Sequence, residues 1–139
     1  MTVLVDSNAL LFSLLTPERL SSRARTLLED RENTLVFSVA SMWEIVIKSR
    51  LGKLHLGGPV ATVLSEEMDR LGMQLLPVEQ AHALRVAALA PAGWTDSSGH
   101  VHRHADPFGR LLVAQAQIEG LPILSADEQL DRYEIDRIW

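Results

Sequence analysis

The 139-residue sequence predicts an α/β fold with three layers, in which helices cover both faces of a central, mostly parallel sheet. Short apolar runs such as Thr2–Val5 and Thr34–Phe37 alternate along the chain with segments of helical periodicity. Strands that are buried on both faces read as unbroken apolar runs, because neither face meets water. Hydrophobic residues make up 47% of the chain, and no repeat or linker divides it, so we expect a single domain over residues 1–139.

The predicted elements are bounded by residues that suit their positions. Asp106 and Pro107 suit the entrance of one helix, and Gly120 suits its end. The predicted helices span Ser7–Leu15, Ser21–Arg31, Ser38–Leu51, Pro59–Leu71, Glu79–Ala90, Pro107–Glu119 and a short Glu128–Arg132. The predicted strands span Thr2–Val5, Thr34–Phe37, Gln74–Val78, Pro122–Leu124 and a last one near Asp136–Ile138. Pro91–Arg103 reads as a polar loop.

The composition excludes several classes of protein. The chain has no cysteine, which rules out a disulfide framework and a thiolate metal site. The N-terminus lacks the pattern of a signal peptide, and no apolar run reaches the ~18 residues of a membrane span, so we expect a cytoplasmic protein with no membrane partner. The net charge of −5 is unlike that of a general nucleic-acid coat protein, so any nucleic-acid chemistry must be local or use cations.

Acidic residues follow two of the predicted strands and open one helix. Asp6 directly follows the first strand, Asp127 comes shortly after Pro122–Leu124, and Asp106 lies at the entrance of the helix that begins at Pro107. Functional sites in parallel sheets lie outside the carboxyl ends of the strands, so we expect these acids to meet at one edge. Each of them also has a simpler interpretation as the N-cap of the helix that follows it.

A fourth acid, Glu44, lies in the almost continuously apolar segment Val39–Ile47. This pattern predicts a helix that is buried on most sides, and a buried carboxylate needs a partner, a metal or a proton. Lys48, one turn further on, offers an ordinary ion pair. Four clustered acids would repel one another without cations, whereas Mg²⁺ or Mn²⁺ binds such a set and can activate water against a phosphodiester.

Three stretches carry a resemblance to a known family: LVDSNALLF at the N-terminus, SVASMWEIVIKSRLGKL at 38–54 and HADPFGRLLVAQAQIEGLPILSAD at 104–127. Together they resemble VapC-type toxins of the PIN-domain family over nearly the whole chain. The resemblance implies a metal-dependent endoribonuclease that cuts structured RNA such as tRNA. It also implies inhibition by a cognate VapB-type antitoxin, and assembly into a homodimer and a toxin–antitoxin hetero-oligomer.

The resemblance also implies roles for particular residues. Asp6, Glu44 and Asp127 match three of the family's metal-site acids, and Ser7 and Ser125 match the hydroxyl residues that accompany them. We expect Asp6, Glu44, Asp106 and Asp127 to be both the catalytic residues and the ligands of Mg²⁺ or Mn²⁺.

Gly109 departs from the family pattern, because similar sequences read D-P-F-D-R at this helix entrance and here the second acid is a glycine. Three explanations stay open. Asp106 takes over the ligand role, or the protein is a catalytically impaired module that binds antitoxin or RNA without efficient cleavage, or Gly109 is an inactivating substitution. We expect the loss of this carboxylate to reduce the activity rather than to change the chemistry.

The segment before this helix is longer than in similar sequences and contains His100, His102 and His104. Its alternating histidines could bind a metal ion, although a solvated loop is the simpler interpretation. A third interpretation is that His102, Arg103 and Arg110 contact RNA phosphates.

Two tryptophans and two helices complete the predictions. Trp43 is expected in the core, whereas Trp94 is harder to place there and could stack on a base. The leucine-rich helices Ser7–Leu15 and Ala61–Leu71 are candidates for association with other chains.

Overall fold

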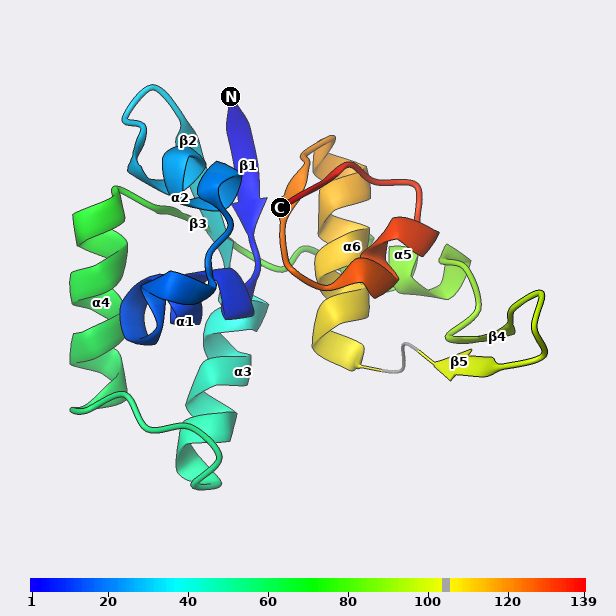
Figure 1. Cartoon of the computed structure of the whole chain (residues 1–139), viewed down its shortest axis with the longest axis horizontal. Coiled ribbons are helices and arrows are strands. Elements are labelled where there is room, and N and C mark those ends of the chain that lie inside the picture. Colours follow the sequence, from blue (N-terminus) through cyan, green and yellow to red (C-terminus); the bar gives the residue numbers. More distant parts are fainter. Residues whose placement is uncertain (104–105) are drawn as a thin grey trace.

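A five-stranded parallel sheet forms the centre of the computed structural model, which describes residues 1–103 and 106–139 (Figure 1). The strand order is β3–β2–β1–β6–β7, and every neighbouring pair is parallel. The strands are β1 (Thr2–Val5), β2 (Thr34–Ser38), β3 (Gln74–Leu76), β6 (Ile123–Leu124) and β7 (Arg137–Ile138). The predicted fold class is therefore confirmed.

Helices cover both faces of this sheet. They are α1 (Ser7–Leu15), α2 (Ser22–Glu29), α3 (Val39–Arg50), α4 (Val60–Leu71), α5 (Gln80–Arg85) and α6 (Pro107–Glu119). In Figure 1, α1, α2 and α4 lie on one side of β1, and α5 and α6 lie on the other. Short 3₁₀ turns occupy Pro17–Arg19, Val86–Ala88 and Glu128–Arg132. None of the helices in the described ranges is long and apolar enough to cross a membrane.

Alternation along β1 divides the core into two layers. Val3 and Val5 are buried against side chains of α1, α2 and α4. Leu4 points to the opposite face, where it packs with Val36, Ile123 and residues of α6. Successive side chains of a strand point to opposite faces, so three residues of one strand anchor both helical layers.

The carboxyl ends of β1 and β6 lie next to each other. Val5 pairs with Leu124, and the backbone N–H of Asp6 donates to the carbonyl of Leu124 over 3.1 Å. Helix α6 runs back along the sheet so that its N-terminus lies at this same edge (Figure 1). The fold therefore brings the residues that follow β1, those that follow β6 and the start of α6 to one place.

Helix α3 is less buried than the sequence predicted. It projects beyond the end of the sheet and packs on α1 and α6 (Figure 1), so one of its faces meets solvent. Trp43, expected in the core, is 61% exposed and contacts the ring of Phe108 edge-on at 5.6 Å between centroids. Val39 and Val46 are also exposed on this helix. The prediction failed because an apolar sequence alone does not show how many neighbours a helix has.

The stretch before α6 also differs from the prediction. Pro91–Arg103, expected to be a loop, contains an antiparallel hairpin of β4 (Gly93–Thr95) and β5 (Val101–Arg103). The helix expected over Glu79–Ala90 is shorter, since α5 ends at Arg85 and a 3₁₀ turn follows. The two strands are only three residues long and flank a polar tip, so the sequence pattern of this stretch was that of a loop.

Candidate active site

All four predicted acids line one small cavity at the carboxyl edge of the sheet. Asp6, Glu44, Asp106 and Asp127 surround a space of about 60 Å³. This space holds a few waters or ions. Other residues of its wall are Ser7, Asn8, Ser41, Lys48 and Gly109.

Asp6 is the acid most strongly affected by its surroundings. Its Oδ2 accepts a hydrogen bond from Ser125 Oγ over 2.7 Å, and its Oδ1 accepts a longer one, 3.3 Å, from Ser7 Oγ. Burial raises the pKa of the Asp6 carboxyl, and the nearby Glu44 raises it further, while the two serine hydroxyls act in the opposite direction. Asp6 occupies the N-cap position of α1, but its side chain makes no cap hydrogen bond to that helix and is held by the two serines instead.

Glu44 is a buried carboxylate held from two sides. Its Oε1 accepts a hydrogen bond from Ser7 Oγ over 2.7 Å, and its Oε2 accepts one from Lys48 Nζ over 3.0 Å. The ion pair with Lys48, which was the simpler interpretation of Glu44, is therefore present. Ser7 has one hydroxyl hydrogen for two carboxylates, and the shorter distance favours its donation to Glu44.

Asp106 and Asp127 combine a place in the cavity wall with a role as helix caps. One oxygen of Asp106 accepts from the backbone N–H of Phe108, and one oxygen of Asp127 accepts from that of Gln129, each over 3.0 Å. Ser125 Oγ links two of the acids, because it donates to Asp6 and accepts from the backbone N–H of Asp127. The capping interpretation thus holds for both residues and fixes where their carboxylates point.

The donor set suits a hard divalent cation. Carboxylate and hydroxyl oxygens line the cavity, and these are the ligands that Mg²⁺ and Mn²⁺ prefer. Among the described residues, no three His, Asp or Glu side chains are already arranged to hold an ion. The carboxylates of Asp6 and Glu44 are held by hydrogen bonds from the serines and Lys48.

Gly109 forms part of the same cavity wall, one turn inside α6. The first turn of α6 contains no acid, although a carboxylate there would also be favoured by the helix dipole. The position where similar sequences have their second acid therefore faces the site, and it contributes no ligand here.

The comparisons with known proteins bear on this arrangement. The family model of the PIN domain matches residues 3–136, nearly the whole chain. The chain belongs to the PIN domain family.

Two individual proteins resemble this PIN domain. Ribonuclease VapC16 of Mycobacterium tuberculosis is 39% identical over 72 residues, which are 51% of this chain and 51% of that protein. The match thus spans about half the length of the curated relative. The crystal structure of VapBC2 from Rickettsia felis bound to a DNA fragment from their promoter gives a TM-score of 0.70 at 12% identity and covers 99% of this chain and 98% of that one. At this identity the likeness shows the fold.

Sequence reasoning missed three polar residues in the wall of the PIN-domain cavity. Asn8 and Ser41 were not singled out, and Lys48 was considered only as a partner of Glu44. Helical spacing could have found Ser41 and Lys48, because residues three and four positions from Glu44 share its face of the helix. Asn8 lies two residues after Asp6 at the start of α1 and carried no comparable signal.

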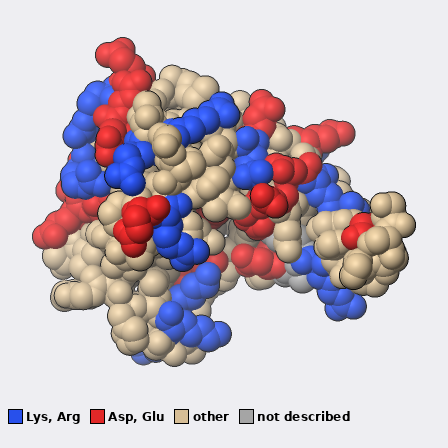
Figure 2. All heavy atoms as spheres, in the orientation of Figure 1, with Lys and Arg blue, Asp and Glu red and all other residues tan. Residues whose placement is uncertain are grey.

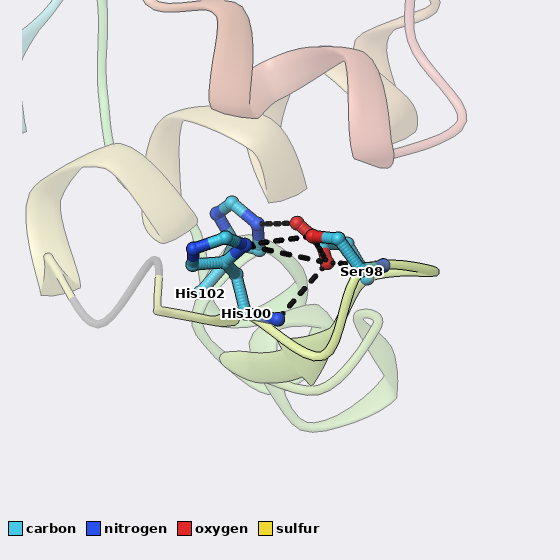
Figure 3. A network of polar contacts seen from close by, with 4 residues as sticks. Ser98, His100 and His102 are labelled. Carbon is cyan, nitrogen blue, oxygen red and sulfur yellow. Dashed lines mark hydrogen bonds and ion pairs between the residues drawn. The ribbon is translucent and has the colours of Figure 1, made fainter.

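The histidines of the β4–β5 hairpin bind to protein groups. Figure 3 shows Ser98, His100 and His102 gathered at one side of the hairpin. Asp96 is the centre of their contacts: its Oδ2 lies 2.6 Å from His102 Nε2, and its Oδ1 accepts from Ser98 Oγ over 2.6 Å and from the backbone N–H of His100 over 3.0 Å. No metal-binding group forms among the described residues of this segment, and His104 lies outside them.

The hairpin network makes Asp96 an unusually strong acid. Hydrogen bonds, first from Ser98 and then from His102, lower the pKa of Asp96 well below its ordinary value of 3.8. A depressed folded pKa stabilises the hairpin at pH values above 3.8, and this contribution is lost as the pH falls below it. An NMR titration of the Asp96 carboxyl carbon should give a midpoint below 3.8, and Ser98→Ala should raise it. A midpoint at or above that value would contradict the network.

The predicted RNA-contacting residues differ in their surroundings. Arg110 Nη1 donates to the carbonyl of Ala90 and to the hydroxyl of Tyr133, each over 3.0 Å, while Arg103 is exposed at the end of β5. The Trp94 ring stacks on His102 at 5.2 Å, and the Arg132 guanidinium lies 3.9 Å from its centroid. Contact of His102, Arg103 and Arg110 with RNA, and stacking of Trp94 on a base, stay predictions.

Proposed function

We propose that this chain is a metal-dependent endoribonuclease and the toxin of a toxin–antitoxin pair. The observation that carries the proposal is the meeting of Asp6, Glu44, Asp106 and Asp127 around one cavity. The name of the mycobacterial relative, a ribonuclease VapC, supports RNA as the substrate. The likeness to a VapBC structure supports a VapB-type antitoxin as the partner that holds the enzyme inactive.

The cofactor of this proposal is Mg²⁺ or Mn²⁺, held by Asp6, Asp106 and Asp127, with Glu44 joining when Lys48 releases it. A bound divalent ion would lower the pKa of a water molecule and stabilise the charge that develops on the phosphodiester. The substrate of this proposal is structured RNA, with tRNA the class implied by the family resemblance. A homodimer, a hetero-oligomer with the antitoxin and a cytoplasmic location complete the proposal.

The side chains of the cavity have separable tasks in this mechanism. Asp6 and Asp127 supply negative charge on either side of Ser125, which orients both of them through hydrogen bonds. Ser7 and Lys48 hold Glu44. Because burial and Glu44 raise the pKa of Asp6, the metal-free site carries electrostatic repulsion that a cation relieves.

A second candidate function is a catalytically impaired PIN module that binds antitoxin or RNA without efficient cleavage. Gly109 favours it, since this residue lines the cavity where similar sequences place a carboxylate. Asp106 lies three residues earlier in the same wall, and its Oδ1 already caps α6. Loss of one ligand should weaken the binding of a second metal ion more than that of the first.

Cleavage of total tRNA and of a broad RNA panel, by the wild type and by Gly109→Asp, separates the two candidates. We expect both proteins to cut with Mg²⁺ or Mn²⁺ and to stop in EDTA, with the variant faster by about tenfold or more because one further carboxylate binds the metal. Asp69→Asn, an exposed change on α4, is the matched control. Cleavage by Gly109→Asp alone would identify an impaired enzyme. Failure of both proteins on every RNA would contradict the nuclease proposal.

A further inference from the structure

A second hollow opens beside the acidic cavity, between the C-terminal half of α3 and the start of α6. It encloses about 250 Å³, and its apolar wall consists of Ile47, Leu51, Pro107 and Phe108. This is smaller than the roughly 300–1,000 Å³ of sites for drug-sized ligands, so it suits one flat group rather than a long segment. We call this hollow the α3–α6 groove.

The α3–α6 groove adjoins the acidic cavity and shares part of its wall. Glu44, Lys48, Asp106 and Phe108 line both of them. A chain that lies across the carboxylates therefore enters the groove with its next unit. In the proposed function, RNA is cleaved at the acidic cavity, and the inference about the groove rests on that function.

The end of α3 places two lysines at this groove. The backbone N–H of Lys53 donates to the carbonyl of Lys48 over 3.0 Å, and that of Gly52 donates to the carbonyl of Ser49 over 3.1 Å. This pair of bonds is the Schellman motif, which needs the left-handed backbone that Gly52 adopts at φ +73°. The motif turns the chain back on the helix, so Lys53 returns to the level of Lys48.

The unusual feature of this Schellman motif is that lysines, Lys48 and Lys53, occupy both of its contacting positions. In a Schellman motif, an apolar contact often joins the two positions that Lys48 and Lys53 occupy here. Two ammonium groups on the wall of one groove repel each other unless an anion lies between or beside them. Lys48 has Glu44 as a partner, while Lys53 is exposed and forms no salt bridge within residues 1–103 and 106–139. Figure 2 shows basic side chains gathered over this end of α3.

The groove combines apolar side chains, which suit the base of a nucleotide, with lysines, which suit its phosphate. Leu51 lines the groove together with Phe108 and is 64% exposed. A base covers apolar surface with its flat face, and its phosphate attracts lysine. We infer that the α3–α6 groove binds the nucleotide next to the scissile phosphodiester of single-stranded RNA, with Leu51 and Phe108 against its base and Lys53 at its phosphate.

Binding of a short fluorescein-labelled single-stranded RNA of mixed sequence, followed by anisotropy in EDTA over a series of salt concentrations, tests the two contacts separately. Lys53→Ala should reduce the slope of log K against log [salt] by about 0.7, the value for one phosphate contact on a single strand. Leu51→Ser should weaken binding by about threefold to tenfold at every salt concentration and leave the slope unchanged. In cleavage by the wild type or by Gly109→Asp, both variants should raise KM and change kcat by less than about twofold.

The chain offers matched controls for both changes. Leu84 on α5 is 66% exposed, almost the same as Leu51, and Arg23 is an exposed cation on α2. Leu84→Ser and Arg23→Ala should leave RNA affinity and its salt dependence unchanged. If the control variants reduce RNA affinity or its salt dependence as much as Leu51→Ser and Lys53→Ala do, the effects do not depend on the groove. That result would overturn the inference.

The remaining outcomes distinguish the inference from the proposed function. If RNA is cut in a metal-dependent way while Lys53→Ala and Leu51→Ser bind RNA as the wild type does, the groove inference fails and the nuclease stands. If the two variants change only self-association in the ultracentrifuge, the groove is a contact between protein chains and the inference is wrong. RNA binding with the expected variant effects, but with no cleavage by any protein, would support the groove and contradict the nuclease.

Discussion

Asp6→Asn is expected to reduce the rate of metal-dependent RNA cleavage by about a hundredfold or more, because the change removes the charge of one of the proposed metal ligands. The substitution keeps the size of the side chain. Asp6 lies at the end of the central strand and is fixed by its backbone bond to Leu124 and by Ser125 Oγ. Initial rates with Mg²⁺ or Mn²⁺, on the RNA that the wild type cuts, measure the loss.

The same change should stabilise the metal-free protein. The pKa of Asp6 is raised in the folded state, so the unfolded chain ionises first as the pH increases above 3.8. The folded state loses stability until the pH passes the folded pKa, and the deficit then stays constant through neutral pH. Asparagine removes this deficit, so urea unfolding at neutral pH in EDTA should show a higher midpoint for Asp6→Asn than for the wild type.

Divalent ions should reverse this order. Mg²⁺ or Mn²⁺ should raise the Tm of the wild type by a few degrees, since a ligand that binds only the folded state stabilises it, and should leave that of Asp6→Asn nearly unchanged. Asp69→Asn should respond as the wild type does. An equal metal-induced rise in both the wild type and Asp6→Asn would show that the cation binds away from the acidic cavity.

Phe37→Ala should destabilise the fold by about 3–5 kcal/mol, whereas Trp43→Ala should cost about 1 kcal/mol or less, although tryptophan is the larger side chain. Phe37 is fully buried in the layer formed with α1, α2 and α4, so its loss leaves a cavity. Trp43 is 61% exposed, and its recorded ring contact is the edge of Phe108. Urea midpoints with constant m-values measure both changes.

This comparison also tests where α3 lies. A loss of several kcal/mol from Trp43→Ala would mean that the ring is buried and that the core prediction from the sequence was correct after all. Phe37→Leu, a smaller deletion in the same layer, provides a folded reference if the alanine variant does not fold. Its loss should fall between those of the other two variants.

Local signals in the sequence were sufficient for the sheet and for the four acids. Unbroken apolar runs identify the strands, and the rule that parallel strands end at one edge predicts that Asp6 and Asp127 lie close together. Ser21, at the start of the predicted helix Ser21–Arg31, is the N-cap of α2, since its side chain accepts from the N–H of Ala24. These features depend on neighbours in the sequence or on the sheet alone.

The remaining features depend on packing between distant segments. Burial of Trp43 depends on which other elements pack against α3, and the sequence of α3 alone does not specify them. The β4–β5 hairpin is held by Asp96, whose four contacts with Ser98, His100 and His102 cross its tip. The pairs Ser7–Glu44 and Ser125–Asp6 join residues 37 and 119 positions apart.

The position of β1 in the sheet has a consequence for synthesis on the ribosome. The strand made first lies in the middle, and its second neighbour, β6, is among the last segments to be made. Long-range pairing of this kind is slow, and it cannot begin before the partner strand has left the exit tunnel. The acidic cavity needs Asp127 as well as Asp6, so a nascent chain has no complete site while most of it is still being translated. In the nuclease proposed above, this strand order would delay RNA cleavage until synthesis is nearly finished, and the translating ribosome and its RNA would be spared by the chain that it is producing.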